Sequence, residues 1–167
     1  MSALLDDMFF AAIAGFCFAY ACNPPLKTLI FSALLAAIAH GLRFALMEFF
    51  HFQNLAIATF VASFFIGCLG ILCAKISKTP AEIIAFPALI PMIPGIYAYK
   101  AILYLFAFIR SEDMSAKTRY LTSFFDHFFT TLSVTLALAV GISVTLLIFF
   151  EQSFMMTRNR KEFKNIT

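Results

Sequence analysis

Charged side chains are scarce in this chain of 167 residues: they make up 13% of the sequence, whereas hydrophobic residues make up 62%. Together with a mean hydropathy of +0.92, this composition excludes an ordinary soluble globular domain. The chain is also too short to hold a separate soluble domain or a nucleotide-binding fold beside its apolar segments. We therefore expect an integral membrane protein.

The sequence also lacks the motifs of common enzyme and metal sites. It has no nucleotide-binding motif, no HExxH motif and no Ser/His/Asp arrangement, and its three histidines are far apart. Its four cysteines form no CxxC pair and have no histidine nearby, so we expect apolar fillers, no metal and no cofactor. An intramembrane enzyme is disfavoured because the Ser and Thr residues of the apolar runs have no evident base nearby.

Five apolar runs predict an all-α membrane protein with about five transmembrane helices. The runs cover residues 8–22, 29–50, 55–74, 82–109 and 124–150. No positive charge precedes the first run, so we expect a retained span and not a signal peptide. The transmembrane domain then covers residues 1–151, and residues 152–167 form a basic tail. The pair Asp126-His127 is expected at the head of the last span, at the membrane interface.

The fourth run, residues 82–109, is too long and too broken for one plain helix. Its 28 residues would form a helix of roughly 42 Å, against a hydrocarbon core of about 30 Å. Each of its prolines lacks an N–H group and clashes with the carbonyl four residues back. The prolines are Pro87, Pro91 and Pro94, and the carbonyls that they would free are those of Ile83, Pro87 and Ile90. Because freed backbone at membrane depth survives only against protein or a polar cavity, the discontinuity at Pro91-Gly95 is a transport-site candidate.

The distribution of lysine and arginine predicts the orientation in the membrane. With five crossings, seven of these residues fall on one side and three on the other. The seven are Lys27, Lys75, Lys78, Arg158, Arg160, Lys161 and Lys164, and the three are Arg110, Lys117 and Arg119. The N-terminus would then lie outside and the C-terminus in the cytoplasm. A fourth segment that re-enters on one side would weaken this bias to six against four.

The number of spans carries a further expectation. Transporters built from inverted repeats pair two halves of opposite orientation, so an odd number of spans is unusual for a transporter that works alone. Five spans therefore suggest half of a larger assembly.

The second run places His40 and Arg43 three residues apart on one helical face, together with small residues that suit close helix packing. The opposite face, which includes Leu35, is bulky and suits lipid. An arginine in hydrocarbon is costly, so it normally faces a cavity or a partner. The alternative is that Arg43 snorkels to the membrane interface, about two helical turns away.

After the break, Tyr97, Lys100 and Tyr104 fall on one face of a helix. Two interpretations remain open. These residues line a solute path, or the tyrosines belong to an interfacial belt and Lys100 pairs with Glu48 or Asp126 of a neighbouring span.

Two strings in these segments resemble a known family: Ala39-His-Gly-Leu-Arg43 in the second run and Ile90-Pro-Met-Ile-Pro-Gly-Ile-Tyr-Ala-Tyr99 in the fourth. They look like the smaller subunit of the two-gene threonine/serine exporter family, which is similar to the C-terminal half of the single-chain exporters. The likeness covers nearly the whole chain. It implies a bacterial inner-membrane exporter of threonine, serine or related carboxylates that is driven by an ion gradient and contains a larger membrane subunit. Lys100 has no counterpart in the family pattern.

The broken span offers groups that suit a carboxylate. We expect the backbone N–H groups of Gly95, Ile96 and Tyr97 to form the exposed N-terminus of the second half-helix, which favours an anion. Gly95 would also permit backbone angles closed to other residues. The predicted substrate-binding residues are Arg43, Pro91, Pro94, Gly95, Ile96, Tyr97 and Lys100.

Two side chains of the second span complete this prediction. Arg43 adds a bidentate carboxylate donor if the second span packs beside the fourth. His40 is the proton-coupling candidate, since no other side chain that is expected inside the membrane titrates near neutral pH in its ordinary state, His127 being expected at the interface. The alternative function is a structural or assembly subunit whose partner carries the whole transport pathway.

Overall fold

The computed structural model describes residues 2–51 and 53–149, and every regular element in them is helical. The helices are α1 (Ser2–Ala21), α2 (Leu26–Glu48), α3 (Leu55–Ser77), α4 (Ala81–Leu89), the short 3-10 helix η1 (Ile90–Met92), α5 (Gly95–Arg110) and α6 (Met114–Ile148). Four of these helices are long and apolar enough to cross a membrane, and α4–η1 with α5 passes the same test as a bent pair, which is either a broken span or a re-entrant loop. The predicted fold class, an all-α membrane protein with about five membrane helices and a break in the fourth segment, is therefore confirmed. The predicted basic tail, residues 152–167, lies outside the described residues.

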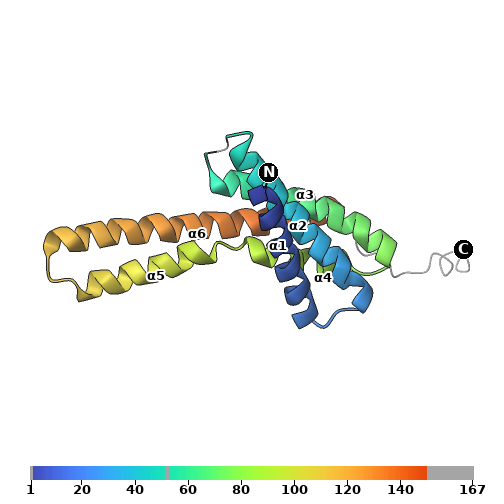
Figure 1. Cartoon of the computed structure of the whole chain (residues 1–167), viewed down its shortest axis with the longest axis horizontal. Helices are drawn as coiled ribbons and strands as arrows, with labels where there is room; N and C mark the ends of the chain where they lie inside the picture. Colours follow the sequence, from blue (N-terminus) through green and yellow to red (C-terminus); the bar gives the residue numbers. More distant parts are fainter. Residues whose placement is uncertain (1, 52, 150–167) are drawn as a thin grey trace, which may run out of the picture.

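The helices form two parts (Figure 1). Helices α1 to α4 gather into a bundle, which the second half of α6 joins by packing along α3. Helix α5 and the first half of α6 form a hairpin that extends away from the bundle. The discontinuity of the fourth span lies where these two parts meet.

Small residues bring the helices of the bundle into close contact. A Cβ atom added to Gly15 of α1 would collide with Ala36 of α2, and one added to Gly67 of α3 would lie 2.7 Å from Thr145 of α6. At Gly141 of α6 the added atom would overlap the Ser63 hydroxyl of α3. These contacts leave no space for larger side chains at the helix crossings.

Buried hydroxyl groups tie the same helices together through backbone carbonyls. Ser32 of α2 donates to the Ile84 carbonyl of α4 at 3.0 Å, and Thr145 of α6 donates to the Phe64 carbonyl of α3 at 3.1 Å. Both hydroxyl side chains are fully buried, so each needs such an acceptor. The hydrogen bonds fix how the helices are placed along one another.

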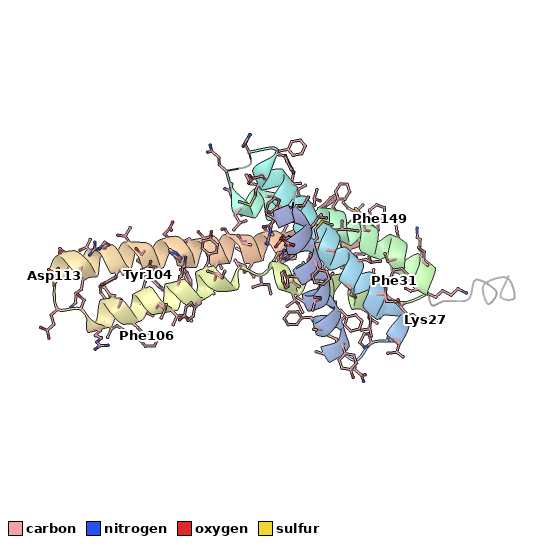
Figure 2. All side chains as sticks on the ribbon, in the orientation of Figure 1. Lys27, Phe31, Tyr104, Phe106, Asp113 and Phe149 are labelled. Carbon is pink, nitrogen blue, oxygen red and sulfur yellow. The ribbon has the colours of Figure 1, made fainter. Side chains whose placement is uncertain are left out.

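The hairpin packs differently. Ala101 is the only described residue of α5 that is buried. Figure 2 shows Tyr104 turned toward α6 and Phe106 on the outer side of α5, where it is 64% exposed. The hairpin therefore presents much of its apolar surface to whatever surrounds it in the membrane.

Helix α6 starts earlier than the sequence analysis predicts. It begins at Met114, ten residues before the predicted start of the last span, because Asp113 caps it by accepting hydrogen bonds from the N–H groups of Ser115 and Ala116. The expectation that Asp126-His127 heads this helix is wrong, since the pair lies more than three turns inside it. With 35 residues, α6 is roughly 52 Å long and exceeds the hydrocarbon core of about 30 Å.

Two further expectations about helix faces and ends need correction. Leu35 does not face lipid: it is 2% exposed, because α2 is surrounded by α1, α3 and α4 and has neighbours on both of its faces. Helix α1 begins at Ser2 and not near residue 8, so Asp6 and Asp7 belong to the helix. As a result the Asp7 side chain faces α2.

Candidate functional site

The break in the fourth span lies between Leu89 and Gly95. Helix α4 continues through Pro87, so this proline does not break it. Three residues of 3-10 helix follow, and then Ile93 takes an extended conformation with φ −62° and ψ 129°. Helix α5 restarts at Gly95, and the two half-helices are bent by 48°. The extended residue is the point where the backbone leaves helical geometry.

Most backbone groups at the break have hydrogen-bond partners, so the set of free carbonyl and N–H groups expected from the sequence needs correction. The Ile90 carbonyl is not free, since it accepts from the Ile93 N–H at 3.1 Å. The N–H groups of Gly95 and Tyr97 donate to the carbonyls of Ile93 and Pro94, at 2.8 and 3.1 Å. Within the described residues, the Ile96 N–H is the one of the three expected donors that makes no hydrogen bond.

Arg43 of α2 reaches the break from the neighbouring helix. Its Nη1 donates to the Met92 carbonyl at 3.1 Å. This carbonyl lacks a helical partner because residues 93 and 94 leave the helical path. The guanidinium therefore points toward the break in the fourth span.

His40 links Arg43 to a residue that the sequence analysis leaves out. Its Nδ1 lies 3.2 Å from Asp7 Oδ2 and 3.4 Å from Arg43 Nη2. Asp7 and His40 are 33 residues apart in sequence and meet because α1 and α2 pack against each other. The available signal was the small-residue spacing of Ala11, Gly15 and Ala19, which indicates the face of α1 that packs on another helix but not its partner.

A cavity of about 730 Å³ opens beside Arg43 and the break. Its lining includes six of the residues predicted from the sequence, which are Arg43, Pro91, Pro94, Gly95, Ile96 and Tyr97. Two acidic residues, Asp7 and Glu48, also line it. The cavity thus offers a guanidinium and an unpaired backbone N–H for a carboxylate, together with carboxylates that suit an ammonium group.

Gly95 contributes space and not an unusual backbone angle. No described glycine has a positive φ, so Gly95 does not use the backbone angles that glycine permits and other residues avoid. A Cβ atom added at Gly95 would meet no atom within 4 Å. The missing side chain therefore keeps this part of the cavity wall open.

Lys100 does not line the cavity of Arg43 and Gly95. It is exposed on α5 and makes no ion pair with any residue in the described ranges, including Glu48 and Asp126. The two tyrosines of its predicted face turn toward α6 instead, with ring centroids 5.7 Å (Tyr97) and 5.2 Å (Tyr104) from that of His127.

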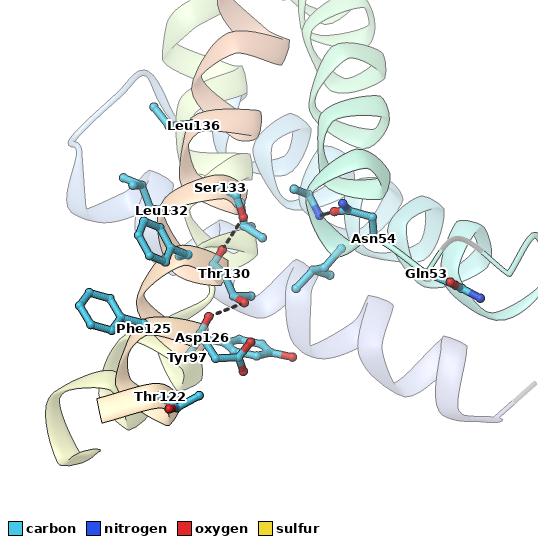
Figure 3. A pocket seen from close by; sticks show the side chains of 14 residues that line it. Gln53, Asn54, Tyr97, Thr122, Phe125, Asp126, Thr130, Leu132, Ser133 and Leu136 are labelled. Atoms are coloured by element: carbon cyan, nitrogen blue, oxygen red, sulfur yellow. Dashed lines mark hydrogen bonds between the residues drawn. The ribbon is translucent and has the colours of Figure 1, made fainter. Parts of the chain in front are cut away.

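A second, wider cavity of about 1120 Å³ lies between the start of α3 and the middle of α6 (Figure 3). Its polar lining residues are Gln53, Asn54, Tyr97, Thr122, Asp126, Thr130 and Ser133. Tyr97 and Leu55 line both cavities, so the two spaces adjoin at these side chains. The sequence does not indicate this cavity, because Asp126 is expected there at the end of a helix and not in its middle.

No cluster of histidine, cysteine, aspartate or glutamate in residues 2–51 and 53–149 could hold a metal ion.

Residues 7–148 match the model of a protein family described as "Threonine/Serine exporter, ThrE". The match covers both the bundle and the hairpin, and it includes every residue that lines the two cavities. No solved structure matches the chain.

Proposed function

Because the chain belongs to the threonine/serine exporter family, we propose that it is one subunit of an ion-gradient-driven exporter of threonine, serine or related carboxylates. We place this exporter in the bacterial inner membrane. The observation that carries this proposal is the Arg43 guanidinium, which meets the broken span at the wall of a cavity large enough for a small solute.

The solute carboxylate binds between Arg43 and the start of α5. Two N–H groups of Arg43 contact Met92 and His40, and the remaining N–H groups are available to an anion. The Ile96 N–H adds a donor at the N-terminus of α5, where the helix dipole favours negative charge. Asp7 and Glu48, on the same cavity, accept from the ammonium group of an amino acid. His40 is the site of proton coupling.

The exporter includes a larger membrane subunit. Two features support this part of the proposal: a chain with five spans does not divide into two inverted halves, and the hairpin presents apolar side chains such as Phe106 and Ile109 that the described part of this chain leaves exposed. The purified chain alone is expected not to move solute in vesicles. Transport by the single chain at the rate of the pair would contradict the two-subunit proposal.

The substitution that tests the site is Arg43→Leu, measured by counter-transport of labelled L-threonine in membrane vesicles. Arg43→Leu should abolish counter-transport, whereas Arg43→Lys should retain part of it, because lysine keeps the charge and loses the planar fork. Arg110→Leu removes an arginine at the tip of the hairpin and is the matched control. If Arg43→Leu assembles and transports normally, the solute path lies in the partner and this chain is a structural subunit.

Protection from a thiol reagent tests the cavity itself. Ile96→Cys, in a background without other cysteines, places a thiol on the cavity wall, and Ile102→Cys places one on the exposed surface of the hairpin. L-Threonine should slow the reaction of Ile96→Cys with a thiol reagent and leave Ile102→Cys unaffected. Equal rates with and without solute, in a variant that still transports, would exclude this cavity.

The orientation proposed from the positive charges has its own test. The N-terminus lies outside and the C-terminus in the cytoplasm. A reporter that is active only in the cytoplasm should therefore be active when fused after Thr167 and inactive when fused at Ser111. The reverse pattern would overturn the orientation.

A further inference from the structure

One nitrogen atom of His40 lies between two groups of opposite charge. Its Nδ1 is 3.2 Å and 3.4 Å from the two carboxylate oxygens of Asp7, and 3.4 Å from Nη2 of Arg43. Both neighbours are close enough to share a hydrogen bond with this atom.

The two hydrogen bonds exclude each other. A protonated Nδ1 donates to the Asp7 carboxylate and offers no lone pair to Arg43, because a ring nitrogen that carries a proton is a donor and not an acceptor. An unprotonated Nδ1 accepts from Arg43 and faces Asp7 with a lone pair, which is stable only if the carboxyl group carries the proton. One proton therefore decides which neighbour His40 binds.

The surroundings confine this choice to three side chains. His40 is 8% exposed, and its Nε2 makes no hydrogen bond within the described residues. Helix α1 contributes Asp7, α2 contributes Arg43, and η1 contributes only backbone groups such as the Met92 carbonyl. Glu48 lines the adjoining cavity and, within the described residues, makes no hydrogen bond or ion pair with the ring.

Asp7 is the member of this group that connects it to the cavity. Its side chain is 39% exposed, against 10% for that of His40, and it belongs to the lining of the 730 Å³ cavity. A proton can enter or leave at the Asp7 carboxylate without passing through the buried ring.

We propose that Asp7, His40 and Arg43 form a proton switch, and that Asp7 is the residue that exchanges the coupled proton with the cavity. In one state His40 is an imidazolium with a proton on each ring nitrogen, and Nδ1–H donates to the Asp7 carboxylate. In the other state the Nδ1–H bond has broken, an O–H bond has formed on Asp7, and His40 is a neutral imidazole that keeps its Nε2 proton, so that Nδ1 accepts a hydrogen bond from Arg43 Nη2. The proton on Asp7 then leaves to the cavity.

The switch acts on transport through Arg43. The same guanidinium holds the Met92 carbonyl through Nη1, so a hydrogen bond gained or lost at Nη2 changes how Arg43 is held at the break. This inference rests on the proposed transport function and assigns its proton step to particular atoms. It adds Asp7, which the sequence pattern alone does not indicate.

A spectroscopic experiment tests the switch without transport. The ¹⁵N spectrum of histidine-labelled full-length protein in lipid nanodiscs shows which ring nitrogens carry a proton, and a His40→Gln sample assigns the His40 signals. In Asp7→Leu, with the carboxylate gone, His40 should lose the proton on Nδ1 and keep the one on Nε2, since Nδ1 then accepts from Arg43. Asp6→Leu, which removes an exposed neighbouring carboxylate, is the matched control and should leave the spectrum unchanged. An unchanged His40 spectrum in Asp7→Leu would overturn the switch.

A transport experiment separates the switch from the proposed function. Membrane vesicles with the chain and its larger subunit are used in two assays. Accumulation of labelled L-threonine driven by a pH gradient is compared with exchange of labelled for unlabelled L-threonine at equal pH. Asp7→Leu should lose accumulation and keep exchange, whereas Asp6→Leu should keep both. If wild-type vesicles show neither activity, the proposed function fails. If they show both, and Asp7→Leu also accumulates the solute, the switch alone is overturned.

Discussion

The two halves of α6 pack in opposite ways, although they belong to one continuous helix. The second half lies against α3 through small residues and buried hydroxyls, such as Gly141 and Thr145. The first half lies against α5 through aromatic contacts, such as that of His127 with Tyr104, and leaves Phe129 57% exposed. The bundle is thus fixed by close backbone contact, whereas the hairpin is held by loosely covered aromatic side chains.

This difference indicates what each part contributes. A close-packed interface tolerates no added atoms and holds its helices in one arrangement. The side chains at the break are therefore positioned by the bundle, since Asp7, His40 and Arg43 all come from α1 and α2. The hairpin carries the other wall, with Gly95 and Tyr97 at its base.

The largest expected effect is on folding, from overpacking the bundle half of α6. Gly141→Leu places a bulky side chain where even a Cβ atom would overlap the Ser63 hydroxyl and lie 3.0 Å from the Phe60 carbonyl. We expect loss of about 1–3 kcal/mol or more of stability, with α3 and α6 forced apart. The measurement is the unfolding midpoint in a detergent titration. Gly95→Ala is the control, because its Cβ has open space, and an equal loss in both variants would contradict the contrast between tight and open sites.

The next effect is on transport and not on folding. Gly95→Val should abolish counter-transport of labelled L-threonine while the protein inserts and unfolds as the wild type does, because its Cβ atom meets no other atom within 4 Å and the side chain takes up space in the cavity. Gly95→Ala fills less of the cavity and should retain part of the activity. Normal transport by Gly95→Val would show that the cavity wall at this point is not used.

A smaller effect is expected from a buried hydroxyl. Thr145→Val removes the donor to the carbonyls of Phe64 and Gly141 and should cost about 1–3 kcal/mol, since the Phe64 carbonyl is left without that partner. Thr135→Val removes an exposed hydroxyl that bonds only to Thr131 of its own helix, and should change stability little. The two variants are compared by the same detergent titration. A larger loss of stability in Thr135→Val than in Thr145→Val would contradict the proposal that the bundle half of α6 is held more tightly than the hairpin half.

The smallest effect is expected at the tip of the hairpin and depends on pH. Hydrogen bonds from the Ser115 hydroxyl, and then from the Ser115 and Ala116 N–H groups, hold the pKa of the Asp113 carboxyl below its ordinary value. The ionised cap is therefore complete above that ordinary value and is lost as the pH falls through the lowered pKa. Hydrogen exchange of the Ser115 and Ala116 amides should speed up over that acid range.

The control is the hydrogen-exchange rate of the same amides in a variant that lacks the cap. Asp113→Ala should show fast exchange at both amides at every pH, whereas amides in the α3 and α6 interface should not change in either protein. Wild-type rates that stay constant down to the acid range would show that Asp113 does not cap α6.

Part of the fold and site was predictable because the relevant signals are local. The discontinuity at Pro91-Gly95 follows from proline chemistry, and the inward direction of Arg43 follows from the cost of a charge in lipid. The start of α6 was not predictable from hydropathy, because a polar first turn capped by Asp113 extends the helix beyond its apolar run. The N–H groups of Gly95 and Tyr97 are not free as expected for a similar reason, since the carbonyls of Ile93 and Pro94 supply local acceptors.

The sequence by itself determined three properties. They are that the chain is a membrane protein, that its fourth span is interrupted at a particular place, and that a family signature surrounds Arg43 and Pro94. These properties depend on composition and on the covalent constraints of single residues, so they do not depend on the partners of a helix. Only the tertiary structure decided that Asp7 meets His40 and that Arg43 meets the Met92 carbonyl, across 33 and 49 residues of sequence. Those contacts depend on how far one helix slides along another, and that register is set by where small residues such as Gly15 and Ala36 allow two backbones to approach.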